Sequence, residues 1–285
     1  MATTIKSAAS TAMSAAVQRL ASNVLLNEEE VEFFEQLQVN RVAYRRGEEF
    51  VTDGEDFRLS FLIRDGWAIK YKMTKSGRRQ IIGVCLPGDF IGLHINFQRR
   101  SIYSVAALTD LEVAIIEPIR ILEVYQKYPV LASGLDWMTV RNFNILSEHN
   151  VSLGARPASQ RILHFILEIW CRLMVVGAAD DSGFRMLMTQ EQIADTVGLS
   201  LVHTNKNLRK LQREGYISVD NGFITFNDKR KAVEFADFDE RFLEQFQTRR
   251  LISAQIAPRE TEEDELARMK ASTGAPSKVA VKKGA

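Results

Sequence analysis

The spacing of apolar positions changes along the chain, and each change marks a different kind of structure. Between Val39 and Glu117, short runs alternate apolar and polar residues, as in Trp67–Met73, and turn signals such as Asp65-Gly66 and Ser76-Gly77 separate them. Alternation with a period of two predicts half-buried strands, and many short strands at even spacing predict a closed or double-sheet β-roll. Before this region, Asn27 is a suitable N-cap for a short helix over 28–37.

A long helical region follows the predicted strands. Pro118–Tyr128 predicts a short helix, and Pro129 is suited to the first turn of a longer one. Side chains then recur at alternating steps of four and three, which is the spacing of a coiled-coil seam. We predict a dimer seam here, and the alternative is a helix buried against its own domain. The predicted seam consists of Leu131, Leu135, Met138, Asn142, Ile145 and His149.

The C-terminal half predicts a compact helical unit. Ser152–Pro157 (SLGARP) predicts a break in the long helix and a hinge, after which Ala158–Val176 is an apolar helix. Thr189–Arg213 predicts two short helices separated by Gly198, with Ser200 as the N-cap of the second. That second helix is cationic and has no acidic residue. Its lysines and arginines are Lys206, Arg209, Lys210 and Arg213.

A hairpin follows these two helices at once, because Tyr216–Phe226 has strand-like runs around Asn221-Gly222. Two helices with a cationic second member, followed by a hairpin, predict a winged helix-turn-helix that binds DNA. The alternative is an ordinary pair of helices with a solvated basic face.

Composition limits the classes of function. The 285 residues suffice for two domains, and the formal net charge is only +1, so a nucleic-acid surface has to come from local clustering. Cys85 and Cys171 are too few and too far apart for a metal site or for an iron–sulfur cluster with four cysteine ligands. No apolar run approaches membrane length. We therefore expect no membrane partner, no metal, no cofactor and a cytoplasmic protein.

Taken in order, these segments resemble the Crp/Fnr family of bacterial transcription regulators. The resemblance covers about 37–226 and rests on Asp65-Gly66, Gly77–Ile81, Leu86–Gly92, the long helix and Thr189–Leu211. It implies an α+β chain with an antiparallel β-roll, a dimerisation helix and a winged helix-turn-helix. It also implies a homodimer on palindromic double-stranded DNA, with RNA polymerase as a candidate partner.

The expected domains follow from these segments. They are a poorly ordered start over 1–26, a β-roll sensor domain with flanking helices over 27–128, a dimerisation helix over 129–153, a DNA-binding domain over 154–230, a helical extension over 231–255 and a disordered tail over 256–285.

The predicted DNA interface lies on and before the second helix of the motif. Val202 stands where the resemblance implies a glutamate, so it can touch a thymine methyl but cannot accept from cytosine; Lys206 can donate to guanine. The expected base contacts are Leu201, Val202, Asn205 and Lys206. The expected phosphate contacts are Thr189, Gln190, Ser200, His203, Arg209 and Lys210.

The sequence defines the effector of the β-roll sensor domain less well than the DNA interface. Members that bind cyclic AMP follow the Pro-Gly-Asp turn with Gly-Glu and later carry Arg-Ser, whereas this chain has Leu93 at the glutamate position. We therefore do not expect a cyclic nucleotide. The candidate effector pocket is Gly88, Asp89, Gly92, Leu93, Arg100 and Ser101. A ligand-binding regulatory module without DNA binding is the alternative function. We expect no enzyme, because the four histidines are not near a plausible nucleophile or carboxylate set.

Overall fold

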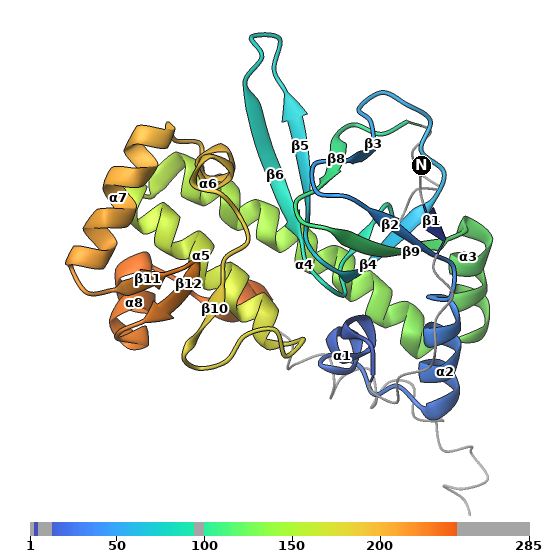
Figure 1. Cartoon of the computed structure of the whole chain (residues 1–285). Helices are drawn as coiled ribbons and strands as arrows, with labels where there is room; N and C mark the ends of the chain where they lie inside the picture. Colours follow the sequence, from blue (N-terminus) through green and yellow to red (C-terminus); the bar gives the residue numbers. More distant parts are fainter. Residues whose placement is uncertain (1–2, 5–12, 94–99, 244–285) are drawn as a thin grey trace, which may run out of the picture.

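The computed structural model describes residues 3–4, 13–93 and 100–243, which form a β-roll, a long connecting helix and a C-terminal helical domain (Figure 1). The β-roll has two sheets of antiparallel strands, with orders β1-β2-β9-β4-β7 and β3-β8-β5-β6. Its strands are β1 Thr3–Thr4, β2 Arg41–Tyr44, β3 Glu49–Val51, β4 Ser60–Asp65, β5 Ala68–Met73, β6 Arg79–Cys85, β7 Phe90–Ile91, β8 Ser104–Ala107 and β9 Leu111–Ile116. The predicted α+β architecture is confirmed.

Two helices precede the roll, and the first corrects the prediction of a poorly ordered start for residues 13–26, whereas residues 1–2 and 5–12 lie outside the described ranges. Helix α1 (Ala15–Ala21) has Ser14 as its N-cap, and its Val17 and Leu20 are fully buried. It packs on the connecting helix, where a Cβ added at Gly134 would come within 2.9 Å of Leu20 Cδ2. Helix α2 (Glu28–Gln36) begins at Asn27 with a capping box, as predicted.

The connecting helix is longer than the sequence indicates. Helix α3 (Pro118–Lys127) leads directly into α4, which runs from Pro129 to Ala155. Gly154 therefore lies inside α4 and does not break it. The chain turns only at Arg156 and Pro157, because the proline ring cannot continue the helix.

The predicted dimer seam is wrong, because most of its side chains are buried within their own chain. Leu131, Leu135, Met138 and Ile145 have at most 7% exposure. Leu131, Leu135 and Met138 pack with residues of α1, α2 and the roll, and His149 bonds to Glu168 of the following helix at 2.7 Å. The alternative, a helix buried against its own domain, describes this face of α4 correctly.

The C-terminal domain contains the winged helix-turn-helix. Its three strands have the order β10-β12-β11, and Asn221 and Gly222 take positive φ at the hairpin turn, as their sequence predicts. The elements are α5 Ala158–Met174, β10 Gly183–Arg185, α6 Gln190–Val197, α7 Leu201–Arg213, β11 Ile217–Asp220, β12 Phe223–Phe226, α8 Lys229–Ala236 and the 3₁₀ helix η2 Glu240–Leu243. The predicted tail over 256–285 lies outside the described residues.

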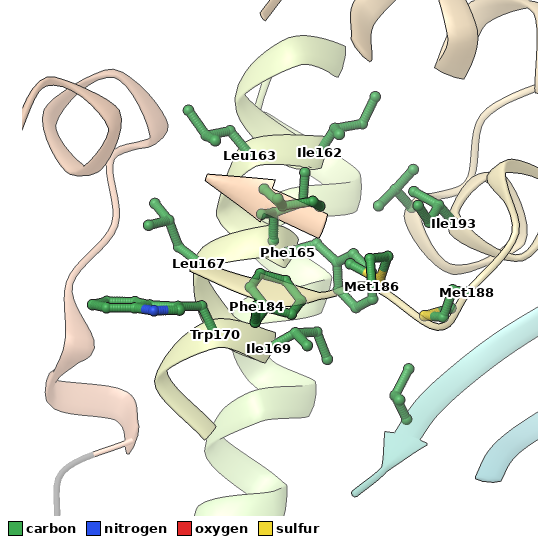
Figure 2. Close-up of a cluster of buried hydrophobic side chains, with 14 of the residues drawn as sticks. Ile162, Leu163, Phe165, Leu167, Ile169, Trp170, Phe184, Met186, Met188 and Ile193 are labelled. Carbon is green, nitrogen blue, oxygen red and sulfur yellow. The ribbon is translucent and has the colours of Figure 1, made fainter. Parts of the chain in front are cut away.

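The core of this domain gathers around α5 and continues into the β-roll. Ile162, Phe165 and Ile169 of α5 lie among Phe184 and the residues around the opening of α6 (Figure 2). The same buried cluster includes Trp67, Ile69, Ile81, Val84 and Leu86 of the roll. The two domains of this chain therefore share one apolar core in this arrangement.

Candidate nucleic-acid interface and sensor cavity

The turn between α6 and α7 is built by residues that satisfy the backbone at each helix end. Thr189 and Gln192 form a capping box at the start of α6. Gly198 ends α6 with a φ of +67°, which a side chain would strain. Ser200 Oγ accepts from the backbone N–H of His203 at 3.2 Å, so α7 begins where the sequence predicts.

Helix α7 presents a cationic stripe to solvent. Thr204, Asn207, Leu208 and Leu211 are buried against the domain. The opposite face carries exposed side chains at helical spacing, and α7 lies at the outer edge of the domain (Figure 1). These outward residues are Val202, Lys206, Arg209 and Arg213. Arg213 belongs to this face although it is absent from the predicted contacts; the helical spacing alone could have placed it there.

The predicted base contacts divide into two groups. Leu201, Val202 and Lys206 are exposed, and Val202 is 79% exposed. Such exposure of an apolar side chain on a helix whose other face is buried is consistent with a contact surface. Asn205 is only half-buried, and its Oδ1 atom is buried without a hydrogen-bond partner. The Asn205 side chain therefore lies partly against its own domain, whereas the predicted base contact needs its amide exposed to solvent.

The predicted phosphate contacts mostly lie at the surface. Thr189, Gln190, Ser200, His203 and Arg209 are exposed. Lys210 is half-buried, and its Nζ lies 3.9 Å from Glu214 Oε1. Arg185 of β10 was not predicted, yet it is exposed and donates to the carbonyl of Asn221 at 3.0 Å, which places a cation at the wing turn. No sequence pattern marked Arg185.

Asp89 of the predicted effector pocket is instead the centre of a buried ion network. Its carboxylate lies 2.7 Å from Arg172 Nη2, 3.2 Å from Arg141 Nη1 and 3.5 Å from Arg19 Nε. Burial by itself raises the pKa of Asp89, but the guanidinium groups outweigh it and hold the pKa far below its usual value. Asp89 is therefore a structural anion that links α1, α4 and α5 to the roll.

The network extends to the helices on either side of the interdomain turn. Arg172 Nη1 donates to Glu168 Oε1 at 2.8 Å, and Glu168 Oε2 lies 2.7 Å from His149 Nε2. Burial raises the pKa of Glu168, but the contacts with His149 and Arg172 lower it to about 2. Arg172 thus bridges the two buried carboxylates, whereas Arg19 and Arg141 pair with Asp89.

The other residues of the predicted pocket lie in different surroundings: Gly88 lies against Ala15 and Arg19, and Gly92 against Phe57. Leu93 and Ser101 are buried, whereas Arg100 is exposed and pairs across a β-bridge with Asp56. Arg100 shares a surface hollow with Gly54, Glu55 and Asp56. An arginine beside two carboxylates on the surface is poorly placed for a cyclic phosphate, and Leu93 offers no carboxylate to a ribose. Arg100 and Leu93 therefore do not reproduce the cation and the carboxylate that the resemblance implies for members that bind cyclic AMP.

A different cavity lies between the roll and α4. Its volume is about 260 Å³, and Ile82, Val84, Phe90, Tyr103 and Ile145 are among its apolar walls. Lys70, Asp89 and Arg172 supply its charged groups, and Asn142 its amide. Among the described residues, no carboxylate lies within ion-pair distance of Lys70, whose Nζ lies 5.6 Å from the centre of the Tyr103 ring. The cavity therefore combines apolar walls with three charged groups, of which Lys70 has no ion-pair partner among the described residues.

Family comparisons agree with this geometry. A β-roll joined by a long helix to a winged helix-turn-helix defines a DNA-binding transcription regulator. The cyclic nucleotide-binding domain model matches residues 41–128, and the Crp-like helix-turn-helix domain model matches residues 160–231. The chain belongs to the Crp/Fnr family and is a DNA-binding regulator of that type.

Individual relatives support the assignment. The chain is 30% identical over 197 residues to the nitrogen fixation regulation protein FixK of Bradyrhizobium diazoefficiens, covering 69% of this chain and 81% of that protein. It is 28% identical over 196 residues to the transcriptional activator protein FnrL of Cereibacter sphaeroides, covering 67% and 77%. The structure of FixK2 from Bradyrhizobium japonicum shares the fold, with a TM-score of 0.62 and 23% identity over 69% of this chain and 96% of that one.

Proposed function

We propose that the protein acts as a homodimer on a palindromic operator, with one α7 helix in each of two successive major grooves. The main support for this proposal is the cationic stripe on the exposed face of α7, which includes Lys206 and Arg209. The opposite face of the same helix is buried against the domain. Two such helices on one side of a duplex lie about one helical turn apart, roughly 34–36 Å. Arg185 at the wing turn and Thr189 at the start of α6 are exposed and suit phosphate contacts.

The second subunit packs along the solvent face of α4. The positions of this proposed seam are shifted by one residue toward the C-terminus relative to those of the predicted seam. The four positions from Phe143 to Leu153 are exposed and recur at steps of three and four, as a coiled coil needs, whereas Thr139 before them is half-buried. Phe143, Leu146 and Leu153 are 68%, 46% and 38% exposed. Because one residue turns a helix by about 100°, this shift moves the seam from the buried face to the free one. The proposed seam is Thr139, Phe143, Leu146, Asn150 and Leu153.

Selection of bound duplexes from a random pool, at stated salt, tests the proposal. We expect two inverted half-sites at fixed spacing. Lys206→Ala should cost about 1–3 kcal/mol at one base pair per half-site and relax selection there. Lys75→Ala, which removes an exposed lysine of the β-roll, is the matched control and should leave the selected sequence unchanged. Wild-type protein that selects no sequence would contradict the proposal and favour the alternative of a ligand-binding module without DNA binding.

We also propose that the effector enters the cavity beneath α4 and is a small organic anion rather than a cyclic nucleotide. Lys70 would face the anionic group, while the apolar walls would hold the remainder. Thermal melting in the presence of short carboxylic acids and of cyclic AMP tests this choice. Stabilisation by an acid that Lys70→Met abolishes supports it, and stabilisation by cyclic AMP alone contradicts it.

The remaining parts of this proposal concern setting and partners. No helix within the described ranges is both long and apolar enough to cross a bilayer. A protein that reads genomic DNA works in the bacterial cytoplasm, with RNA polymerase as a further partner, and we propose no enzymatic activity for it. Footprinting with and without polymerase on a selected operator tests the partner.

A further inference from the structure

We propose that Arg161 is a positioning residue that fixes the spacing between the two half-sites which the dimer reads. This inference rests on the proposed function and concerns how α7 is held relative to α4. Recognition depends on α7, but the separation of two α7 helices depends on how rigidly each is joined to the helix that carries the seam. That junction lies at the C-terminal ends of α4 and α6.

The guanidinium of Arg161 joins these two helix ends. Its Nη2 donates to the carbonyls of Leu153 and Arg156 at 3.0 and 3.2 Å, at the end of α4. Its Nη1 donates to the carbonyl of Val197, the last residue of α6, at 2.9 Å. The last carbonyls of a helix have no partner within the helix, and they carry its negative dipole end. One planar cation therefore donates to carbonyls at both helix ends at once, which a point charge such as lysine cannot do in the same geometry.

Direct packing supports the same junction. The φ of Gly198 is positive, and a Cβ added there would come within 2.8 Å of Leu153 Cδ2. The turn of the helix-turn-helix thus lies against the last seam residue of α4. Only Arg156 and Pro157 separate α4 from α5, so the covalent connection is short as well.

The sensor domain holds the neighbouring part of α6. Gln80 Nε2 of β6 donates to the carbonyl of Thr196 at 3.1 Å, and Arg79 Nε lies 2.8 Å from Asp195 Oδ2. The end of α6 is therefore fixed by β6 on one side and by Arg161 on the other. Arg161 connects the end of α6 to the end of α4 by hydrogen bonds, beside the packing of Leu153 on Gly198.

A spacing profile tests the role. Binding is measured for full-length protein on duplexes in which the selected half-sites are separated by the optimal distance or by one or two base pairs more or less. Wild-type protein should lose affinity steeply away from the optimum. For Arg161→Gln we expect about tenfold weaker binding at the optimum and a profile that is nearly flat, with unchanged base preference within each half-site. Arg161→Lys should lie between them, and it keeps the test valid if the glutamine variant does not fold.

Lys206→Ala is the matched control, because it weakens base reading without touching the junction. Its affinities should fall by one common factor at all spacings, so its profile keeps the wild-type shape. A folded Arg161 variant that behaves in this parallel way would overturn the inference. If wild-type protein shows no inverted half-sites at all, the proposed function fails instead, so the two failures are distinguishable.

Discussion

The buried carboxylate of Asp89 offers a decisive test of what holds the two domains together. Asp89→Asn keeps the size of the side chain but removes the charge that Arg19, Arg141 and Arg172 share. It also weakens the acceptor for the backbone N–H of Leu86, which donates to Asp89 Oδ2 at 2.8 Å. The three guanidinium groups are nearly inaccessible to water, so solvent cannot replace the lost charge.

The expected cost follows from this burial. Breaking a buried ion pair by removing one partner typically costs about 3–5 kcal/mol, because the remaining charge stays buried and uncompensated. Native stabilities are about 5–15 kcal/mol, so this loss is a large part of the total. For a chain of this size it corresponds to a fall in Tm of about 6–20 °C.

Thermal and urea unfolding at pH 7, followed by circular dichroism, measure this loss. Asp181→Asn is the control, because Asp181 pairs with Lys229 at 3.2 Å but its side chain is 87% exposed, so less than about 1 kcal/mol should be lost. Adding Arg141→Met to Asp89→Asn should restore part of the stability by removing one unpaired cation. If Asp89→Asn unfolds within about 1 kcal/mol of wild type, the network does not hold the domains as we infer.

Two further predictions concern the seam and pH. Phe143→Glu together with Leu146→Glu should raise the dimer dissociation constant at least ~100-fold in sedimentation experiments, because charges replace exposed apolar residues of the proposed seam. The control is Ile119→Glu on the exposed face of α3, which should leave the dissociation constant unchanged. Burial, together with Arg156, lowers the pKa of His164 to about 4. Between this pKa and the ordinary pKa of histidine, His164 is protonated in the unfolded chain but neutral in the folded chain. Stability should therefore fall by about 2 kcal/mol between pH 7 and pH 5, and His164→Phe, beside Phe238, should remove most of that slope in urea titrations. An equal slope in the variant would refute the assignment to His164.

Local signals were sufficient for much of the DNA-binding motif. Gly198 and the Asn221-Gly222 turn need backbone conformations that few other residues adopt, and Ser200 caps α7 through its own hydroxyl. The outward stripe of α7 follows from helical spacing, because this helix has apolar residues on one face and cations on the other. Such features involve residues close in sequence, so they can be predicted without the fold.

The orientation of α4 could not be predicted in the same way. Apolar side chains occur on both its buried face, as at Leu135, and its exposed face, as at Phe143. Both faces repeat at steps of four and three, and they differ by a shift of one residue. Only the packing of α1, α2 and the roll against one face shows which one remains free for a partner.

The order of the main elements, the winged helix-turn-helix and the cations on the exposed face of α7 could be predicted from the sequence, because each depends on spacing within a short segment. Which face of α4 is buried, which residues line a cavity and what Asp89 contacts became known only from the tertiary structure. The arginines around Asp89 come from α1, α4 and α5, at sequence positions 19, 141 and 172, and no local pattern relates them. Burial removes water as a competing partner, so only the folded chain determines which charges must pair.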